Sequence, residues 1–224
     1  MCGRYFLHSD AAAMTRLFGE MPMPRLAPRY NIAPTQPVPI VRAASGGGRE
    51  MVLVRWGLVP GWSKGPDSRY SMINARVETV AEKPAYRSAL RYRRCLVPAD
   101  GFYEWHQSAG GKQPYVLRPR ATGPFALAGL WEHWQDASGN ELESCVILVG
   151  PANGQVAAIH ERMPVVIAPA SFDLWLDPQR QSAGPVEALL AAQQAPEYRI
   201  YPVARAVNSP SVDRPELLEP LEET

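Results

Sequence analysis

Cysteine is scarce in this sequence, and its spacing excludes two common uses. The 224 residues include only Cys2, Cys95 and Cys145, an odd number without a CxxC pair or a cluster with histidine. Neither a disulfide framework nor a structural zinc site is therefore expected. Cys95 and Cys145 lie in apolar runs, where cysteine usually packs as a small hydrophobic residue. Cys2 lies outside any such run.

The sequence also has little net charge and no long apolar stretch. The formal net charge is +1, so any site for an anion must be local. The only lysines are Lys64, Lys83 and Lys112, which leaves arginine, the residue best suited to bidentate phosphate contacts, as the main cation. Because no stretch resembles a membrane span or a signal peptide, we expect a cytoplasmic, reduced protein that contacts no membrane.

Length and composition predict one α+β domain over residues 1–224. A hydrophobic content of 46% is enough for one sizeable core. Strands and helices do not alternate as βαβ units, which favours the α+β class. Regularly spaced short strands predict a curled antiparallel sheet or a small β-barrel as the core, flanked by short helices. The Pro- and Glu-rich end, about residues 213–224, is expected to be frayed.

Turn residues and apolar periodicity place the individual elements. A helix is expected from Ala11 to Phe18, capped by Ser9 or Asp10 and ended by Gly19. Further helices are expected at 84–92, 153–159, 171–176 and 186–193. Strands are expected at 37–42, 50–56, 94–98, 101–107, 113–118, 125–131, 144–150, 163–168 and 199–203.

The second residue permits a reaction that no internal cysteine can perform. Methionine aminopeptidases remove Met1 when the next residue is small, and Cys2 qualifies. Removal leaves an α-amine and a thiol on one residue, with ordinary pKa values near about 8 and about 8.5, so both are partly available at neutral pH. With an aldehyde, the amine forms an imine and the thiol then closes a thiazolidine ring. A cysteine at position 2 is usually accidental, so this reaction needs support from the rest of the chain.

Three polar residues stand where apolar or turn residues would be ordinary. Glu104 lies among aromatic residues, and a carboxyl in an apolar wall tends to have a raised pKa that suits proton transfer near neutral pH. His160 has the side chain best placed to exchange protons at pH 7. The amide of Asn74 can hold an amine and a thiol in one orientation. The ordinary alternatives are a strand residue facing water, a hydrogen-bonded histidine and a turn residue, respectively.

Candidate nucleic-acid contacts are weaker signals. Arg76 and Arg162 could each grip a phosphate as a fork, or form an ordinary salt bridge with a nearby glutamate. Trp62 and Trp105 could stack on bases, although such residues more often belong to the core.

Several blocks of the sequence together match one family. The chain resembles the SRAP family (SOS-response-associated peptidase, the abasic-site processing proteins) over nearly its full length. The matching blocks are MCGRY at 1–5, YNIAPT at 30–35, WGLVP at 56–60 with Trp62, NAR at 74–76 with Glu78 and Thr79, CLVPADGFYEW at 95–105, AGLWE at 128–132, AN at 152–153 and HERMP at 160–164. One departure is Val149-Gly150, where family members often carry a pair of threonines.

The resemblance implies that the protein captures abasic sites in single-stranded DNA. Cys2, freed of Met1, would attack the ring-opened sugar and form a stable thiazolidine crosslink, with associated lyase-type activity. Asn74 would orient the Cys2 amine, Glu104 would act as general acid and base, and His160 would help to open the sugar. The family was also proposed to be a peptidase that removes its own Met1.

The resemblance also implies the contacts around this centre. Arg76 and Arg162 would hold the flanking phosphates, Arg4 would border the site, and Trp62 and Trp105 would contact neighbouring bases or wall the pocket. No cofactor and no metal are implied. We expect a monomer that associates with the nucleoid when bound to DNA. The main alternative is an N-terminal-nucleophile hydrolase, in which Cys2 uses its own amine as a base to cleave amides.

Overall fold

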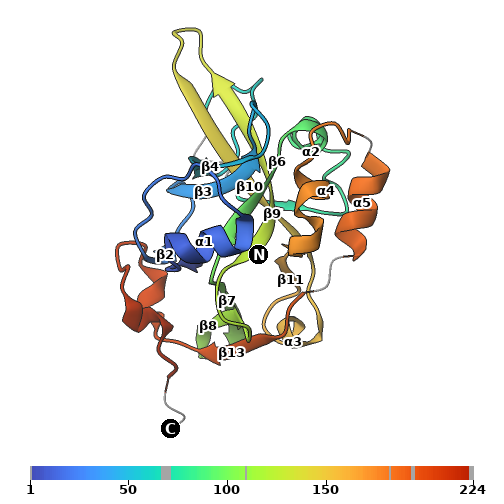
Figure 1. Ribbon diagram of the computed structural model, residues 1–224. Helices are drawn as coiled ribbons and strands as arrows, with labels where there is room; N and C mark the ends of the chain where they lie inside the picture. The colour runs from blue at the N-terminus through green and yellow to red at the C-terminus, as the bar shows by residue number, and fades with distance from the viewer. Residues whose placement is uncertain (1, 67–71, 109, 182, 193–194, 222–224) are drawn as a thin grey trace.

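The computed structural model describes residues 2–66, 72–108, 110–181, 183–192 and 195–221. Its strands form a five-stranded and an eight-stranded sheet, with short helices around them (Figure 1). The strands are β1 (Tyr5–Leu7), β2 (Arg29–Ile32), β3 (Pro37–Ala43), β4 (Arg49–Trp56), β5 (Asn74–Arg76), β6 (Arg94–Ala99), β7 (Gly101–Ser108), β8 (Gly111–Pro119), β9 (Phe125–Gln135), β10 (Glu141–Pro151), β11 (Arg162–Pro164), β12 (Val166–Ile167) and β13 (Tyr198–Pro202). The helices are α1 (Ala11–Phe18), α2 (Arg87–Tyr92), α3 (Gly154–Ala157), α4 (Phe172–Leu176) and α5 (Ala183–Ala192), and the 3-10 helices are η1 (Pro169–Ser171), η2 (Arg205–Asn208) and η3 (Pro215–Leu218).

Strands of the larger sheet close into a small barrel. β4 pairs with β3, β3 with β6, β6 with β9 and β9 with β10, and β10 returns to β4. Each pair is antiparallel except the last, in which Ser144 and Cys145 lie parallel to Arg55 and Trp56. Closure leaves few free strand edges. The predicted α+β class with a small barrel core is therefore confirmed.

The smaller sheet carries the start of the chain. Its order is β13-β8-β7-β1-β2, so β1 has an antiparallel neighbour on each edge. The sequence did not predict β1, β2 or β5, because runs of three or four residues are too short to show a period of two. The predicted strand at 163–168 is divided into β11 and β12, where the Val165 N–H instead donates to the Leu148 carbonyl at 3.0 Å.

The first helix illustrates how local sequence sets its ends. The Asp10 carboxylate accepts the Ala13 N–H at 2.8 Å, which makes Asp10 the cap. Ser9 is unavailable for that role because its N–H and hydroxyl both donate to Asp100. Gly19 ends the helix with a φ of 86°, a conformation that favours glycine.

The other helices are close to their predicted positions. α2 begins at Arg87, later than predicted, because the N–H groups of Tyr86 and Arg87 both donate to Lys83 and form turns first. Residue 193 of the predicted last helix lies outside the described residues. Within the described part of the chain, no helix has the length and apolar character needed to cross a bilayer.

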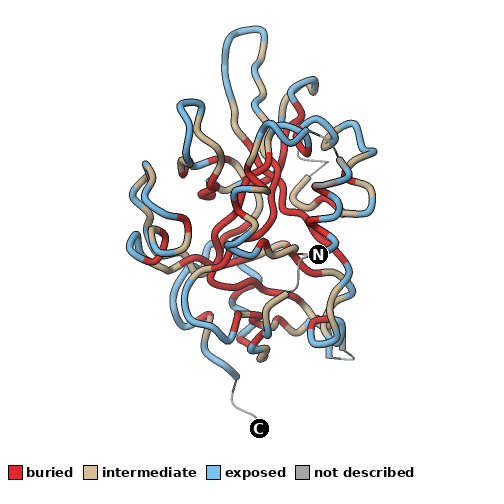
Figure 2. The backbone as a smooth tube through the Cα atoms, turned by 45° about the vertical axis from the view of Figure 1, so that its right-hand side comes forward, coloured by how far each residue is buried: buried red, intermediate tan, exposed pale blue. Residues whose placement is uncertain are grey.

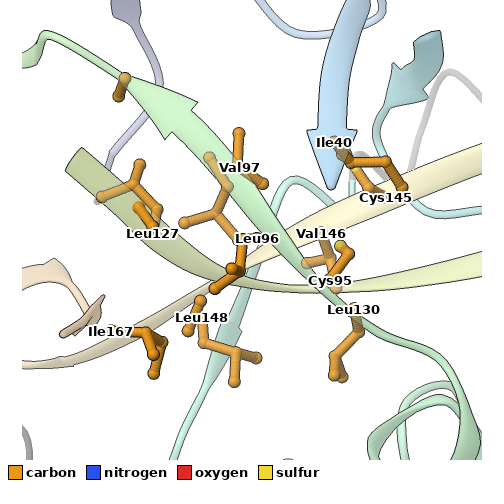
Figure 3. Close-up of a cluster of buried hydrophobic side chains, with 14 of the residues drawn as sticks. Ile40, Cys95, Leu96, Val97, Leu127, Leu130, Cys145, Val146, Leu148 and Ile167 are labelled. Atoms are coloured by element: carbon orange, nitrogen blue, oxygen red, sulfur yellow. The ribbon is translucent and has the colours of Figure 1, made fainter. Parts of the chain in front are cut away.

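The hydrophobic core lies on both faces of the barrel wall. Strand register puts Ile40 and Val97 on one face and Leu96, Leu130 and Val146 on the other, and all of them are buried (Figure 3). The central strands are buried and the connecting loops are exposed (Figure 2). Cys95 and Cys145 are buried in this core, as the sequence predicted.

The C-terminal segment is packed, so the fraying predicted for residues 213–224 is wrong for its described part, 213–221. The Asp213 carboxylate accepts the N–H groups of Tyr30 at 2.5 Å and Asn31 at 3.0 Å and pairs with Arg29 at 2.9 Å. Leu217 is buried in a small cluster on the smaller sheet. These long-range contacts hold a segment whose composition alone suggests disorder. Residues 222–224 lie outside the described residues.

Gly101, at the start of β7, lies in tight contact with its neighbours on β1 and β8. A Cβ added there would lie 2.2 Å from the Phe6 ring and 2.8 Å from the Leu117 carbonyl oxygen. Because both neighbours are buried or part of the backbone, we expect Gly101→Ala to destabilise the fold by about 2 kcal/mol. Thermal unfolding should show a clear loss of Tm. Gly46→Ala is the control, since nothing lies within 4 Å of its added Cβ. Equal melting of the two variants would contradict this packing.

Candidate functional site

Pairing of the first residues with β7 brings Glu104 to the start of the chain. The Tyr103 N–H donates to the Arg4 carbonyl at 3.0 Å, in continuation of the β1–β7 pairing. One further step in this antiparallel register sets Gly3 opposite Glu104. Cys2, the residue before Gly3, is fully buried. The negative charge of Glu104 raises the pKa of the Cys2 thiol, in addition to the larger effect of burial, which shows that the two groups are within electrostatic reach.

Asn74 holds Cys2 from the barrel. β5, which begins at Asn74, lies parallel to β10 with Asn74 beside Ile147. The Asn74 amide nitrogen donates to the Cys2 carbonyl at 2.7 Å. The amide oxygen of Asn74 is buried and has no hydrogen-bond partner among the described residues. One side chain therefore fixes the orientation of Cys2 and has an acceptor left for a further donor.

Glu104 is poised for proton transfer near neutral pH. The side chain is 1% exposed, and burial raises its pKa from the ordinary 4.5 to about 7. The alternative of a strand residue that faces water is therefore excluded. The aromatic setting of Glu104 correctly predicted this raised pKa.

The Cys2 thiol differs from the sequence expectation. Burial raises its pKa far above the ordinary range, so the buried thiol is neutral at pH 7 rather than partly ionised. The thiol donates to the Arg4 carbonyl oxygen at 3.9 Å. A neutral thiol reacts slowly, so the arrangement requires a base, and Glu104 is the acidic group beside it. Met1 lies outside the described residues, and its removal stays a prediction.

His160 lies in the turn between β10 and β11, after the short helix α3. Its backbone N–H donates to the Val156 carbonyl at 2.9 Å. Its Nδ1 lies 3.0 Å from the Arg162 N–H and 3.2 Å from the Arg162 carbonyl, so Nδ1 accepts from the first or donates to the second according to the tautomer. Burial lowers the pKa of His160, so the ring is neutral at pH 7. The fold thus orients His160 through backbone contacts near the end of the same β10 that positions Asn74.

Arg76 and Arg162 gather around one carboxylate. The Arg162 guanidinium pairs with Glu78. Although burial acts in the opposite direction, hydrogen bonds and the charges of Arg162 and Arg76 lower the pKa of Glu78. The salt-bridge alternative is therefore correct for Arg162 in this structure, while Arg76 is exposed. A phosphate at this place would compete with Glu78 for Arg162.

The other three residues predicted to contact DNA, Arg4, Trp62 and Trp105, have different surroundings from one another. Arg4 is half-buried, and its Nη1 donates to the Asn31 side-chain oxygen at 2.8 Å and to the Val207 carbonyl at 2.9 Å. Trp62 is 71% exposed. Trp105 donates from its indole nitrogen to Asn208 and packs on the face of β7 opposite Glu104. The structure therefore does not bring Trp105 to the wall beside Glu104.

Two tyrosines near Cys2 were not found from the sequence. Burial, followed by the electrostatic influence of Cys2, raises the pKa of Tyr198. The pKa of Tyr5 is also raised by burial, and Cys2 contributes. Both hydroxyl oxygens are buried without a hydrogen-bond partner among the described residues. No sequence signal identified them, because tyrosine is an ordinary residue in a strand.

Gly150 is not required by packing. A Cβ at this position would meet Val77 and Val165 at 3.5 Å and 3.7 Å, which are ordinary contacts. Val149 pairs with Arg76 on β5 and with Pro164 on β11. The position of the family's threonine pair is thus a regular strand in this chain.

The fold and these residues define a known class of protein. The family model for SOS response associated peptidase (SRAP) matches residues 1–210, and the chain belongs to this family. The abasic site processing proteins YoqW and YoaM of Bacillus subtilis (strain 168) are 36% and 37% identical to it over 223 residues. These matches cover 98% of this chain and 99% and 98% of the two relatives.

More distant proteins share the same architecture. The abasic site processing protein HMCES of Gallus gallus is 31% identical over 269 residues, which cover 99% of this chain and 78% of that protein. A crystal structure of a protein from Bacteroides thetaiotaomicron superimposes with a TM-score of 0.84 at 23% identity, over 99% of this chain and all of that one. This second likeness establishes the fold.

The buried carboxyl of Glu104 predicts a pH-dependent stability. In the unfolded chain Glu104 ionises near its ordinary pKa of 4.5, whereas in the folded protein it stays protonated up to about 7. Stability is thus highest below pH 4.5 and falls as the pH rises to 7, by on the order of 3 kcal/mol from this group. Glu104→Gln cannot ionise, so relative to the wild type it should gain this amount between pH 4.5 and pH 8. Urea unfolding at both pH values measures it.

A matched substitution controls for other titrating groups. Glu20 is exposed, so Glu20→Gln should differ from the wild type by the same small amount at both pH values. If the difference between Glu104→Gln and the wild type does not change with pH, Glu104 does not have a raised pKa.

Proposed function

We propose that this protein captures abasic sites in single-stranded DNA by forming a covalent thiazolidine crosslink through Cys2 after loss of Met1. The observation that carries the proposal is the constraint on Cys2, whose carbonyl is held by Asn74 at 2.7 Å beside the buried carboxyl of Glu104. The relatives YoqW, YoaM and HMCES are named abasic site processing proteins, which supports the choice of substrate.

The reaction balances without a cofactor. Hydrolysis of the first peptide bond releases methionine and frees the Cys2 amine. The amine adds to the C1′ aldehyde of the open sugar, and loss of one water gives an imine. The thiol sulfur then adds to the imine carbon, its proton passes to the nitrogen, and the five-membered ring closes. The product therefore has the mass of the processed protein plus the DNA minus one water.

Glu104 suits the proton transfers of both imine formation and ring closure. A carboxyl with a pKa of about 7 is present in both forms at neutral pH. The protonated form donates to the departing hydroxyl during imine formation, and the ionised form accepts the proton of the Cys2 thiol. Since the thiol is neutral when buried, ring closure depends on this base.

The other residues orient the substrate and the nucleophile. The buried oxygen of Asn74 is available to accept from the Cys2 amine. Neutral His160 assists ring opening of the sugar, and Arg76 and Arg162 hold the flanking phosphates, the latter by exchange from Glu78. An imine at C1′ also permits elimination of the 3′ phosphate, which accounts for a lyase side reaction.

Substitution of Cys2 separates the amine from the thiol. Cys2→Ala keeps a small second residue, so Met1 removal and the free amine are retained. We expect the wild type to give a band with abasic single-stranded DNA that survives boiling in detergent, and Cys2→Ala to give none. Borohydride should restore a band with Cys2→Ala, because it reduces the imine to a stable amine. Intact mass should show loss of Met1 and of one water in the wild-type adduct.

The outcome also separates the peptidase alternative. A wild-type protein that forms no adduct with abasic DNA, but cleaves peptides in a manner that depends on Cys2, would overturn DNA capture in favour of hydrolysis.

Glu104→Gln tests the proton shuttle. Its rate of crosslink formation at saturating DNA should fall by about 100-fold, the size of a typical general acid–base contribution. The wild-type rate should show an inflection near pH 7, where Glu104 ionises, and the variant should lack it. Affinity for single-stranded DNA should stay close to that of the wild type. Equal losses of affinity and rate, with the inflection retained, would make Glu104 a structural residue.

A further inference from the structure

The exposed aromatic side chains of this protein are few. Two of the large exposed hydrophobic residues in the described part of the chain are aromatic: Trp62, which is 71% exposed, and Tyr92, which is 45% exposed. Trp62 lies in the loop after β4, and Tyr92 ends α2. An exposed ring becomes a candidate for stacking on bases when cations lie beside it.

Contacts through β9 bring these two segments together. The Arg93 guanidinium, directly after α2, pairs with Glu132 at 2.7 Å, and the Arg93 carbonyl accepts the Trp131 N–H at 2.9 Å. The Trp62 loop meets the adjoining residues of the same strand. There the Trp134 indole donates to the Ser63 carbonyl at 2.9 Å.

Packing at Gly61 confirms the approach of the Trp62 loop to β9. A Cβ on Gly61 would lie 3.1 Å from the His133 carbonyl oxygen and 4.0 Å from the Glu132 carboxylate. Glu132 thus lies between this loop and the Arg93 end of α2, which places the two segments next to each other.

This surface also carries cations that are free of carboxylates. Arg87 and Arg91 are one helical turn apart on the exposed side of α2. Neither has an ion-pair partner among the described residues, in contrast to Arg93. Lys83 and Lys64 are exposed on the adjoining segments. Free guanidinium groups beside exposed rings are the combination that binds single-stranded nucleic acid without reading its sequence.

The same surface connects to the candidate site. At the base of the Trp62 loop, the Leu58 N–H donates to the Met72 carbonyl at 3.0 Å. The Trp56 indole donates to the Ile73 carbonyl at 3.0 Å. The next residue, Asn74, contacts Cys2. The loop that carries Trp62 is therefore bonded at its base to the segment that leads into Asn74.

We propose that the exposed face of α2, formed by Arg87, Arg91 and Tyr92, together with Trp62, binds the single-stranded DNA that flanks the captured sugar. Phosphates contact the two arginines and bases stack on the two rings. This inference rests on the proposed function for its substrate. To the base contact that the resemblance already implies for Trp62, it adds the exposed face of α2, whose residues have no part in the reaction.

Salt dependence of binding tests this surface. The probe is single-stranded DNA with intact bases, in a long form of about 20 nucleotides and a short form of about 5. For the long probe, the Arg87→Gln/Arg91→Gln variant should lower the slope of log affinity against log salt by about 1.4, the value for two phosphate contacts on a single strand. Tyr92→Ala should weaken the long probe by about fivefold or more. Affinity for the short probe should change much less.

A charge-matched variant controls for net charge. Arg16→Gln/Arg120→Gln removes the same charge from exposed positions on α1 and beyond β8. If the α2 variant has the same slope and affinity as this control, the inference is overturned. Crosslinking at saturating abasic DNA should persist in the α2 variant. Absence of any crosslink in the wild type would overturn the proposed function, whereas a reduced slope specific to α2 would still support this surface.

Discussion

The arrangement depends on strand pairing at both edges of β1. This strand has only three residues, but β2 and β7 hold it on either side. The bond from Tyr103 to the Arg4 carbonyl extends the pairing towards the terminus, and Asn74 then fixes the carbonyl of Cys2 from the barrel. The first residues of a chain are usually mobile. Here two sheets restrain them, and the proposed ring closure between groups on one residue would depend on that orientation.

Restraint by burial has an electrostatic consequence. Water is excluded from both Cys2 and Glu104, and burial raises the pKa of each. Alone, a buried thiol would be a poor nucleophile. The same exclusion moves the neighbouring carboxyl to about 7, where it can remove the thiol proton at neutral pH. The negative charge of ionised Glu104 further raises the pKa of the Cys2 thiol. In the proposed reaction, the environment that keeps the thiol neutral therefore also supplies its base.

Local sequence predicted the barrel strands and the position of Glu104, because alternation, turn residues and an acid among aromatics are visible over a few residues. The family blocks then assigned Asn74 and His160, which have no distinctive local pattern. What the sequence could not provide is long-range contact. Arg4 donates to the Val207 carbonyl, 203 positions further along the chain. Tyr198, at the start of β13, lies close enough to Cys2 for the two to interact electrostatically. The predicted fraying of the C-terminus failed for the same reason.

Arginine content alone says little about DNA binding in a chain with a net charge of +1. Arg94 is buried and donates to four carbonyl oxygens, so its charge serves the fold. Arg42 pairs with two glutamates. Only exposed arginines without such partners keep charge available for a polyanion, and Arg87 and Arg91 satisfy that condition among the described residues. They lie on the segment that follows Asn74, so one stretch of chain both orients Cys2 and carries these cations.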